Sequence, residues 1–386
     1  MQKTVNIGII GGGLMGREFA SAAARWCHLV DFPVRPVVTA VASRTEKSCG
    51  WFTENIQSVS FSTTDYRELL ALSDIDAVYC AVPHNLHQQF YVDIIRAGKH
   101  LLGEKPFGID AAANRAILEA LKGNPDVIAR CVSEFSFYPG AQRIIKAIRE
   151  ERFGRILEVE AGFLHSSDLN PEKPMNWKRT IAMNGEYGCM GDLGMHVFHI
   201  PLWAGWYPKT VYAVLSNIRP ERKNDKGEWV PCETWDNATM LCEVDSRSGG
   251  FPMTLKFQRI APGELNTWYI NVIGDKYSAK FSLKQPRTLR SLTYETGGPQ
   301  IWTDEDLGYS SVYPTISGGI FEFGFTDAIQ QVFAAFLHRL HKGSTGEIPF
   351  DCATPEETRI HHEILTAALQ SNREKRMIEL QIQAEA

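Results

Sequence analysis

The fold of this chain is decided by a glycine-rich stretch near its start, VNIGIIGGGLMG at residues 5–16. A mostly apolar run that ends at Ile10 predicts a buried strand, and Leu14 opens an alanine-rich segment typical of a helix. Between them, Gly11, Gly13 and Gly16 have the spacing G-x-G-x-x-G. In that setting the loop holds a dinucleotide pyrophosphate against a helix N-terminus.

Each glycine of the loop has a separate physical task. The first permits a tight turn, the second lets the backbone approach the pyrophosphate, and the third lets the helix pack closely on the strand. We therefore predict that the dinucleotide is bound by Gly11, Gly13, Leu14, Met15 and Gly16. The alternative is a glycine-rich turn without a ligand.

Up to about residue 132, short apolar runs alternate with helical segments, which is the pattern of consecutive βαβ units. The predicted strands are 5–10, 37–42, 77–82, 100–102 and 127–132. The predicted helices are 14–27, 45–55, 65–72, 86–97 and 110–121. Because parallel strands need helical crossovers, we expect an α/β domain with a doubly wound parallel sheet of the Rossmann type.

Beyond a predicted helix at 139–149, longer β-rich runs follow with few helices between them. They lie at 155–163, 210–218, 238–244, 253–260, 267–273, 277–283 and 289–294. This pattern predicts an α+β domain with an open, mainly antiparallel sheet, followed by helices at 327–340 and 355–370. The expected divisions are 1–132 for the nucleotide domain, 133–350 for the second domain, and 351–386 for a C-terminal helix and tail packing on the first.

Composition narrows the class of protein. The 386 residues suffice for two domains of common size, and 44% hydrophobic with 22% charged residues is typical of a globular chain. A net charge of −5 without a dense basic stripe argues against nucleic acid. Eight cysteines without a CxxC pair indicate reduced thiols. With no signal peptide and no apolar run near the roughly 18 residues that span a bilayer, we expect a cytoplasmic protein without a membrane partner.

The end of the second strand distinguishes NAD from NADP. An acidic residue there would bind the ribose 2′-hydroxyl and repel a 2′-phosphate, whereas this strand is followed by Ser43 and Arg44. Because arginine can pair with a phosphate, the sequence slightly favours NADP over NAD. An arginine exposed to solvent without a ligand is the alternative, so both cofactors stay open.

Two other strand ends carry polar residues where ligands of α/β sheets bind. One contains Pro83, Asn85 and His87, with Asn85 suited to cap the next helix. The other is Glu104-Lys105-Pro106, where the proline keeps Lys105 extended at the edge of the crevice. We predict that these residues bind the cofactor, and that Lys105 also binds substrate.

Taken together, the glycine loop, the stretch Pro83 to His87, the segment at 97–100 and the Glu104-Lys105-Pro106 motif resemble the Gfo/Idh/MocA family of NAD(P)-dependent sugar and inositol oxidoreductases. The switch to an antiparallel second domain is similar as well. This resemblance implies a Rossmann domain, Lys105 beside the substrate, and a C-terminal sheet that forms homodimer or homotetramer contacts.

A second motif, at 191–199, contains Asp192 and His196. In a helix these residues share one face, so the histidine could accept a hydroxyl proton while the carboxylate orients it. An ordinary polar pair on a helix is the alternative, and the resemblance implies catalytic roles for both. His199 could join them around zinc, but no further coherent ligand set is present, so we predict no metal.

Two departures from the family limit the resemblance. Many members have Asn-x-Arg-Phe-x-Pro where this chain has Glu134 to Pro139, and His199 stands where aspartate is common. Ahead of the motif, His165, Trp177 and Lys178 could supply an aromatic surface and donors for a polyhydroxylated ring, although such residues are often only packing.

The sequence thus predicts hydride transfer between a secondary hydroxyl of a sugar, glycoside or cyclic polyol and NAD(P). Lys105 would stabilise alkoxide character while His196, supported by Asp192, takes the proton. One alternative is elimination or hydrolysis of a glycoside by a retained NAD, and another is a nucleotide sensor without catalysis.

Overall fold

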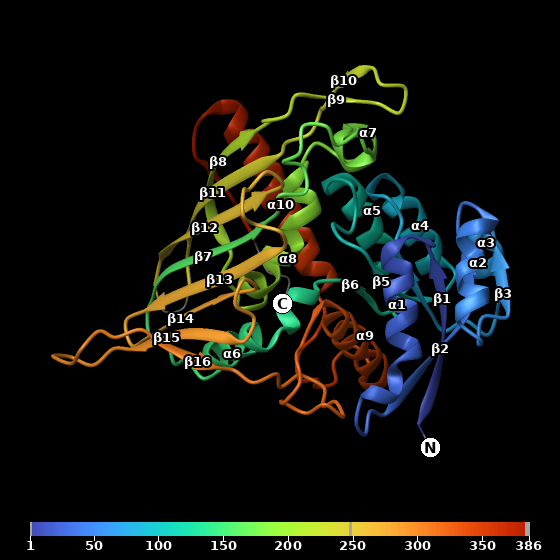
Figure 1. The fold of residues 1–386 in the computed structure, drawn as a ribbon, viewed down its shortest axis with the longest axis horizontal. Coiled ribbons are helices and arrows are strands. Elements are labelled where there is room, and N and C mark those ends of the chain that lie inside the picture. The colour runs from blue at the N-terminus through green and yellow to red at the C-terminus, as the bar shows by residue number, and fades with distance from the viewer. Residues whose placement is uncertain (1, 247–248, 383–386) are drawn as a thin grey trace. The chain divides into compact units, whose positions relative to one another are not determined.

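The computed structural model describes residues 2–246 and 249–382. Contacts between Cα atoms divide the chain into two compact units, which are described separately. The first unit comprises Met1–Gly108, Ala112–Phe137 and Tyr309–Pro355, and the second comprises Ile109–Ala111, Tyr138–Gly308 and Glu356–Ala386. Figure 1 shows their helices and strands.

The first unit contains a six-stranded parallel sheet in the order β3-β2-β1-β4-β5-β6. Its strands are β1 (Lys3–Ile10), β2 (Val34–Ala42), β3 (Phe61–Thr63), β4 (Ala77–Cys80), β5 (His100–Gly103) and β6 (Ala129–Cys131). The strand order reverses beside β1, which is the doubly wound topology of dinucleotide-binding domains. The predicted α/β fold is confirmed, with β3 added to the strands that the sequence predicted.

Six helices belong mainly to this unit. They are α1 (Leu14–Ala24), α2 (Glu46–Asn55), α3 (Tyr66–Leu70), α4 (His87–Arg96), α5 (Ala111–Lys122) and α9 (Phe325–Lys342). Two of these helices have an N-cap side chain. Thr45 caps α2 by accepting a hydrogen bond from the Ser48 amide, and Asp65 caps α3 by accepting one from the Arg67 amide. The predicted cap at Asn85 is wrong, because Asn85 lies inside the short 3-10 helix η2 (His84–Leu86) and α4 begins after Leu86.

The second unit is built on a nine-stranded sheet in the order β16-β15-β14-β13-β7-β12-β11-β8-β17. Its strands are β7 (Ile156–Leu164), β8 (Pro208–Ser216), β11 (Asn237–Val244), β12 (Phe251–Gln258), β13 (Thr267–Gly274), β14 (Tyr277–Ser282), β15 (Thr288–Thr293), β16 (Thr303–Asp306) and β17 (Ile378–Glu379). Neighbouring strands are antiparallel except β7 and β12, which are parallel. A separate two-stranded ribbon joins β9 (Glu221–Lys223) and β10 (Trp229–Pro231).

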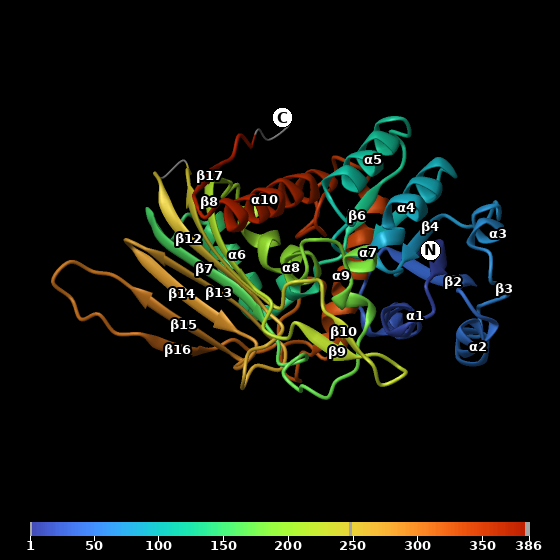
Figure 2. The same ribbon diagram turned by 90° about the horizontal axis from the view of Figure 1, so that it is seen from above.

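The helices of this unit are α6 (Pro139–Arg149), α7 (Ile181–Asn184), α8 (Cys189–Trp203) and α10 (Pro355–Glu374). Both ribbon views place α8 and α10 on the same face of the nine-stranded sheet (Figures 1 and 2). In α10, Ser371 accepts from the Ala213 amide of β8 at 3.0 Å and Asn372 from the Leu215 amide at 3.1 Å. The sheet therefore has one face buried under helices.

The observed units differ from the divisions expected at 132 and 350. The helix α9 packs on α1, where Arg25 and Asp327 form an ion pair of 2.9 Å, so it belongs with the first unit. The helix α10 packs on β8 and belongs with the second unit, not the first as expected for 351–386. The sequence also favours a helix surface pair at His361 and His362, but both are buried in α10.

Candidate active site

The glycine loop closes tightly between β1, β2 and β4. Gly11 has φ +109°, and a side chain there would overlap the carbonyl oxygen of Ala81. A side chain at Gly16 would overlap the carbonyl oxygen of Gly11. Only glycine satisfies both positions, because the first needs a positive φ and the second a close approach of helix and loop.

Gly13 differs from these two glycines, because no atom lies within 4 Å of the position its Cβ would take. It is the N-cap of α1 without a capping side chain, and no acidic residue stands in the first turn. Leu14 is 73% exposed and Met15 half-buried, so this helix N-terminus opens to solvent. Free amides, a positive helix end and open space fit a pyrophosphate.

Ser43 and Arg44 follow β2 beside this loop. The Ser43 hydroxyl accepts a hydrogen bond of 3.1 Å from the Gly12 amide, which ties the loop to the end of β2. Arg44 is exposed. Ser43 therefore helps to fix the conformation of the loop. Arg44 is accessible at the end of the strand where the ribose of a dinucleotide would bind.

The predicted residues after β4 divide into accessible and buried ones. Pro83 is half-buried and Asn85 is exposed, whereas His87 is fully buried. The His87 ring contacts the Val82 carbonyl at 3.1 Å and accepts from the Gly108 amide at 3.3 Å. The sequence had placed His87 among the cofactor contacts, but its burial gives it the task of holding two loops.

Lys105 lies in the turn after β5 and is half-buried, with a cis peptide bond to Pro106. The residue before it, Glu104, is buried and accepts a hydrogen bond of 2.7 Å from the Tyr79 hydroxyl. The Tyr91 hydroxyl donates to the Glu104 carbonyl at 2.8 Å. Two buried tyrosines thus fix Glu104, and through it the turn that presents Lys105.

Glu134, the first of the departures from the family pattern, is buried at the start of η3 (Glu134–Phe137), just after β6. Burial, together with the nearby Glu104, raises the pKa of its carboxyl to about 8, while Lys105 acts in the opposite direction. A carboxyl group whose raised pKa favours the neutral form therefore lies near Lys105.

In the second unit the predicted motif forms the first half of α8, which confirms that it is helical. Gly185 and Gly188 precede it at positive φ, and a side chain at Gly188 would lie 2.7 Å from the Trp235 amide nitrogen. Asp192 and His196 are four residues apart, so they share one face of the helix. Both are buried.

Asp192 is held by two cations. Its Oδ1 accepts a hydrogen bond of 2.9 Å from Lys178 Nζ, and its Oδ2 pairs with Arg259. Lys178 lies in η4 (Trp177–Arg179), and Arg259 directly follows β12. Ion pairing stabilises the ionised form of a carboxyl, so this geometry favours Asp192 as a carboxylate.

More buried charges continue this cluster. Asp168 accepts a hydrogen bond of 2.7 Å from Lys173 and lies 4.0 Å from Arg259. Burial would raise the pKa of Asp168, but Arg259, Lys173 and Arg179 outweigh burial and hold that pKa below its usual range. Arg179 pairs in turn with Asp236. Burial raises the pKa of the Asp236 carboxyl, even though Arg179 acts in the opposite direction.

The remaining predicted substrate residues are accessible. His165 and Trp177 are half-buried, as is Lys178, whose ammonium lies 5.5 Å from the centre of the Trp177 ring. The Phe163 ring lies 4.5 Å from His165 and 5.5 Å from His196, between centroids. The structure therefore brings His165 and His196 to one phenylalanine, and Lys178 and Asp192 to one ion pair.

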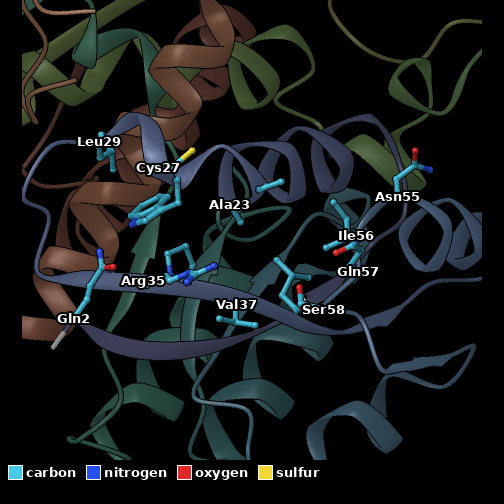
Figure 3. A pocket seen from close by; sticks show the side chains of 14 residues that line it. Gln2, Ala23, Cys27, Leu29, Arg35, Val37, Asn55, Ile56, Gln57 and Ser58 are labelled. Carbon is cyan, nitrogen blue, oxygen red and sulfur yellow. Dashed lines mark hydrogen bonds between the residues drawn. The ribbon is translucent and has the colours of Figure 1, made fainter. Parts of the chain in front are cut away.

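A cavity of about 620 Å³ lies elsewhere in the first unit (Figure 3). Its walls include Arg35 and Val37 from the first half of β2, and Ala23 and Asn55 near the C-terminal ends of α1 and α2. Ligands of such sheets bind beyond the carboxyl ends of strands, and the glycine loop is at that end. This cavity is therefore not the dinucleotide site.

Three features of the described residues bear on other functions. In residues 2–246 and 249–382, no helix is long and apolar enough to cross a bilayer. The same part of the chain has no group of three or more potential ligands arranged to hold a metal ion. Its eight cysteines are free thiols, and Cys27 is exposed while the other seven are buried.

The fold and these sites define a two-unit protein with a Rossmann unit of the dinucleotide-binding topology and a sheet unit that carries polar residues on a buried helix. Comparison with known families agrees with this class. Residues 5–130 match the model described as the Gfo/Idh/MocA oxidoreductase family, NAD-binding Rossmann fold, and residues 141–280 match the Gfo/Idh/MocA C-terminal domain. The chain belongs to this family.

Several curated relatives are similar in sequence. A levoglucosan dehydrogenase from Pseudarthrobacter phenanthrenivorans is 28% identical over 58% of this chain and 57% of its own length. A scyllo-inositol 2-dehydrogenase (NADP(+)) from Bacillus subtilis is 29% identical over 56% of this chain and 64% of its own length. The matches thus span less than two thirds of these relatives.

Solved structures confirm the fold over nearly the whole chain. A levoglucosan dehydrogenase in complex with NADH has a TM-score of 0.86 at 21% identity, covering 98% of this chain and 99% of that one. An oxidoreductase domain protein from Kribbella flavida has a TM-score of 0.87 at 20% identity, covering 99% and 100%.

Sequence reasoning missed the residues that hold the motif in place. Arg259 pairs with Asp192, and Asp168 lies 4.0 Å from Arg259, although both are far from Asp192 in the sequence. One signal was available, because Arg259 continues the apolar positions Met253, Leu255 and Phe257 of an alternating run, and an arginine buried at such a position needs an acidic partner.

Proposed function

We propose that this protein transfers a hydride between a secondary hydroxyl of a sugar, glycoside or cyclic polyol and NAD(P). One observation carries the proposal: Asp192 and His196 share a buried face of α8, with Asp192 ion-paired, in a chain that belongs to an NAD-binding oxidoreductase family. The names of the relatives, levoglucosan and inositol dehydrogenases, support a polyhydroxylated ring as substrate.

The residues of the glycine loop have the task of holding the cofactor. The open N-terminus of α1 at Gly13 and Leu14 would bind its pyrophosphate, and Ser43, Arg44, Pro83 and Asn85 lie at strand ends of the same sheet. When bound, the nicotinamide accepts the hydride from the carbon that carries the hydroxyl group. The exposed Arg44, without an acidic residue after β2, favours NADP slightly over NAD.

The chain's own side chains would handle the proton and the charge. As the hydroxyl is oxidised, its proton passes to a ring nitrogen of His196, which must be neutral beforehand. Asp192 is already paired with two cations, so it supports the charge of the imidazolium and does not take the proton. Lys105 would stabilise negative charge that develops on the substrate oxygen.

The substrate ring would be held by side chains with remaining accessible surface. Lys178 donates to Asp192 and keeps about a third of its side chain exposed (31%), so its ammonium could also reach hydroxyl groups of a substrate. Trp177 and His165 are half-buried and offer an aromatic surface and a further donor or acceptor.

The test is a screen of monosaccharides, inositols and glycosides in which NADH and NADPH absorbance are followed separately. We expect turnover with at least one polyol, and a loss of about 10²–10⁴-fold in kcat for His196→Asn, which removes a general base. Lys105→Met should lower kcat by about 10²–10³-fold, as expected for one group that stabilises an oxyanion. Binding of NAD(P) by both variants, measured by fluorescence, serves as the control for folding.

Three outcomes would contradict the proposal. Turnover of the best substrate that is unchanged in Lys105→Met would exclude the role of this lysine. Cofactor that survives purification without net reduction would indicate elimination or hydrolysis assisted by NAD. Binding of NAD(P) with no reaction across the polyol set would indicate a sensor.

A further inference from the structure

The strongest unassigned feature of the second unit is a chain of buried charges that ends on Asp192. Arg259 lies between two carboxylates, pairing with Asp192 and lying 4.0 Å from Asp168. The side chains of all three are at most 8% exposed. Charges buried to this degree persist only when they are paired, so their arrangement is constrained by their neighbours.

The backbone around Arg259 is fixed as well. Its amide donates to the Asp236 carbonyl at 3.0 Å and to Asn237 Oδ1 at 3.1 Å. Its carbonyl accepts from the Asp168 amide at 3.0 Å. Arg259 therefore has a rigid base at the end of β12, from which its guanidinium reaches Asp192.

The two cations on Asp192 differ in their surroundings. The Lys178 side chain is 31% exposed, whereas that of Arg259 is 8% exposed. Water and salt therefore weaken the Lys178 pair more than the Arg259 pair. Arg259 is then the cation that keeps a constant charge and orientation on Asp192.

We propose that Arg259 is a positioning residue of the reaction, which acts through Asp192, and that Asp168 holds Arg259 from the other side. This inference rests on the proposed function for His196 as the proton acceptor. Arg259 neutralises part of the Asp192 charge and so limits how strongly that carboxylate stabilises a protonated His196. The affinity of His196 for the proton would be set by a residue that never contacts the substrate.

Two substitutions should shift His196 in opposite directions. In Arg259→Gln the loss of a positive charge leaves Asp192 more negative, so protonation of His196 becomes easier and its titration moves to higher pH. In Asp168→Asn the loss of a negative charge leaves the Arg259 charge less compensated, so the titration moves to lower pH. Among the described residues, the titratable or charged groups on and around α8 include Cys189, Asp192 and His199 on the helix, His165 after β7, Lys178 and Arg179 in η4, Asp236 before β11, Arg259 after β12, and His361 in α10.

The experiment follows the His196 ring by NMR of the full protein labelled at histidine, with the resonance assigned by its loss in His196→Gln. We expect Arg259→Gln to shift the midpoint by about one pH unit upward, with kcat/KM at lower pH falling about tenfold. Arg259→Lys keeps the charge, so it should retain the midpoint of the native protein. Arg339→Gln is the matched control, because Arg339 is buried to a similar degree and pairs with a carboxylate, Asp351, but belongs to the first unit.

Arg339→Gln should lower the melting temperature without moving the His196 titration. A folded Arg259→Gln protein with an unshifted midpoint overturns the proposal. If Arg259→Gln does not fold, Asp168→Asn decides, and an unchanged or upward midpoint overturns it. The titration is read without substrate, so opposite shifts in a protein that oxidises no polyol would sink the proposed function and leave this inference standing.

Discussion

Glu134 begins η3 with 5% of its surface exposed, and burial raises the pKa of its carboxyl from 4.5 to about 8. A group whose pKa is higher in the folded than in the unfolded state stabilises the fold while it is protonated. That contribution is complete below the unfolded pKa and is lost as pH rises through the folded one. For Glu134 the stability of the first unit should therefore fall between about pH 4.5 and about pH 8.

Glutamine has nearly the same shape and stays neutral, so Glu134→Gln should remove this loss. We expect the variant to have the same free energy of unfolding as the native protein near pH 5, and to be more stable near pH 8 by an order of a few kcal/mol. Urea unfolding at both values measures the difference. Glu119→Gln is the control, because Glu119 is exposed and pairs only with Lys122 at the surface.

An equal change for Glu134→Gln and Glu119→Gln would contradict the buried, neutral state of Glu134.

Glu134 also shows how much of the site could be predicted from the sequence. Its place after the fifth predicted strand marked it as a departure from the family pattern, but its neighbour Glu104 directly follows β5. Only the parallel pairing of β5 and β6 brings the two carboxyls together.

Among the helices, α8 is unusual because nearly every residue is buried, including both polar residues of the motif. It packs on α10 at Gly194, where a Cβ would lie 2.5 Å from Nε2 of His361. His361 is itself fully buried, and burial lowers its pKa well below the usual value. A side chain at position 194 would therefore push a neutral, enclosed ring.

Gly194→Ala should destabilise the protein by about 1–3 kcal/mol, the usual cost of overpacking a core. Gly50→Ala is the matched control in α2, since its Cβ would meet only Glu54 Oε1 at 3.8 Å. There alanine should stabilise by up to about 1 kcal/mol through helix propensity. Thermal unfolding of both variants provides the comparison, and equal shifts would show that His361 does not press on Gly194.

Elements with strong local signals were predicted well. The helix predicted at 139–149 is α6 with the same bounds, because Pro139 suits a first turn and its apolar residues recur with helical spacing. Short strands such as β3 and β9 were missed, since three residues carry too little pattern. The burial of His361 and His362 was missed because α10 is covered on more than one side, which a single-helix pattern does not show.

The residues of the candidate site also divide into those with a local sequence signal and those without one. The glycine loop, Lys105, Asp192 and His196 belong to motifs short enough to recognise in the sequence. Asp168 and Arg259 could not be assigned to the site, because Arg259 reaches Asp192, and Asp168 approaches Arg259, only where the segments after β7 and β12 lie together. The parallel pairing of these two strands, an exception in an otherwise antiparallel sheet, is a tertiary feature.

For the molecule in solution, we propose a homodimer or homotetramer that forms through the nine-stranded sheet. Along β8, Val211, Ala213 and Leu215 are buried, while Tyr212 and Val214 between them are exposed. On β11, Leu241 pairs with Tyr212, and these three apolar side chains are 36–51% exposed on the sheet. A cluster of exposed apolar residues on a sheet face is typical of an association surface.

Val214→Glu combined with Leu241→Glu should dissociate the assembly, because charges would be desolvated in the interface, while the fold loses little from surface changes. Sedimentation velocity at micromolar concentration measures the mass, and circular dichroism checks that each variant is folded. Leu265→Glu serves as the control, because Leu265 is 83% exposed in a loop outside the sheet. A native protein that sediments as a monomer, or a double variant that keeps its mass, would exclude this surface as the interface.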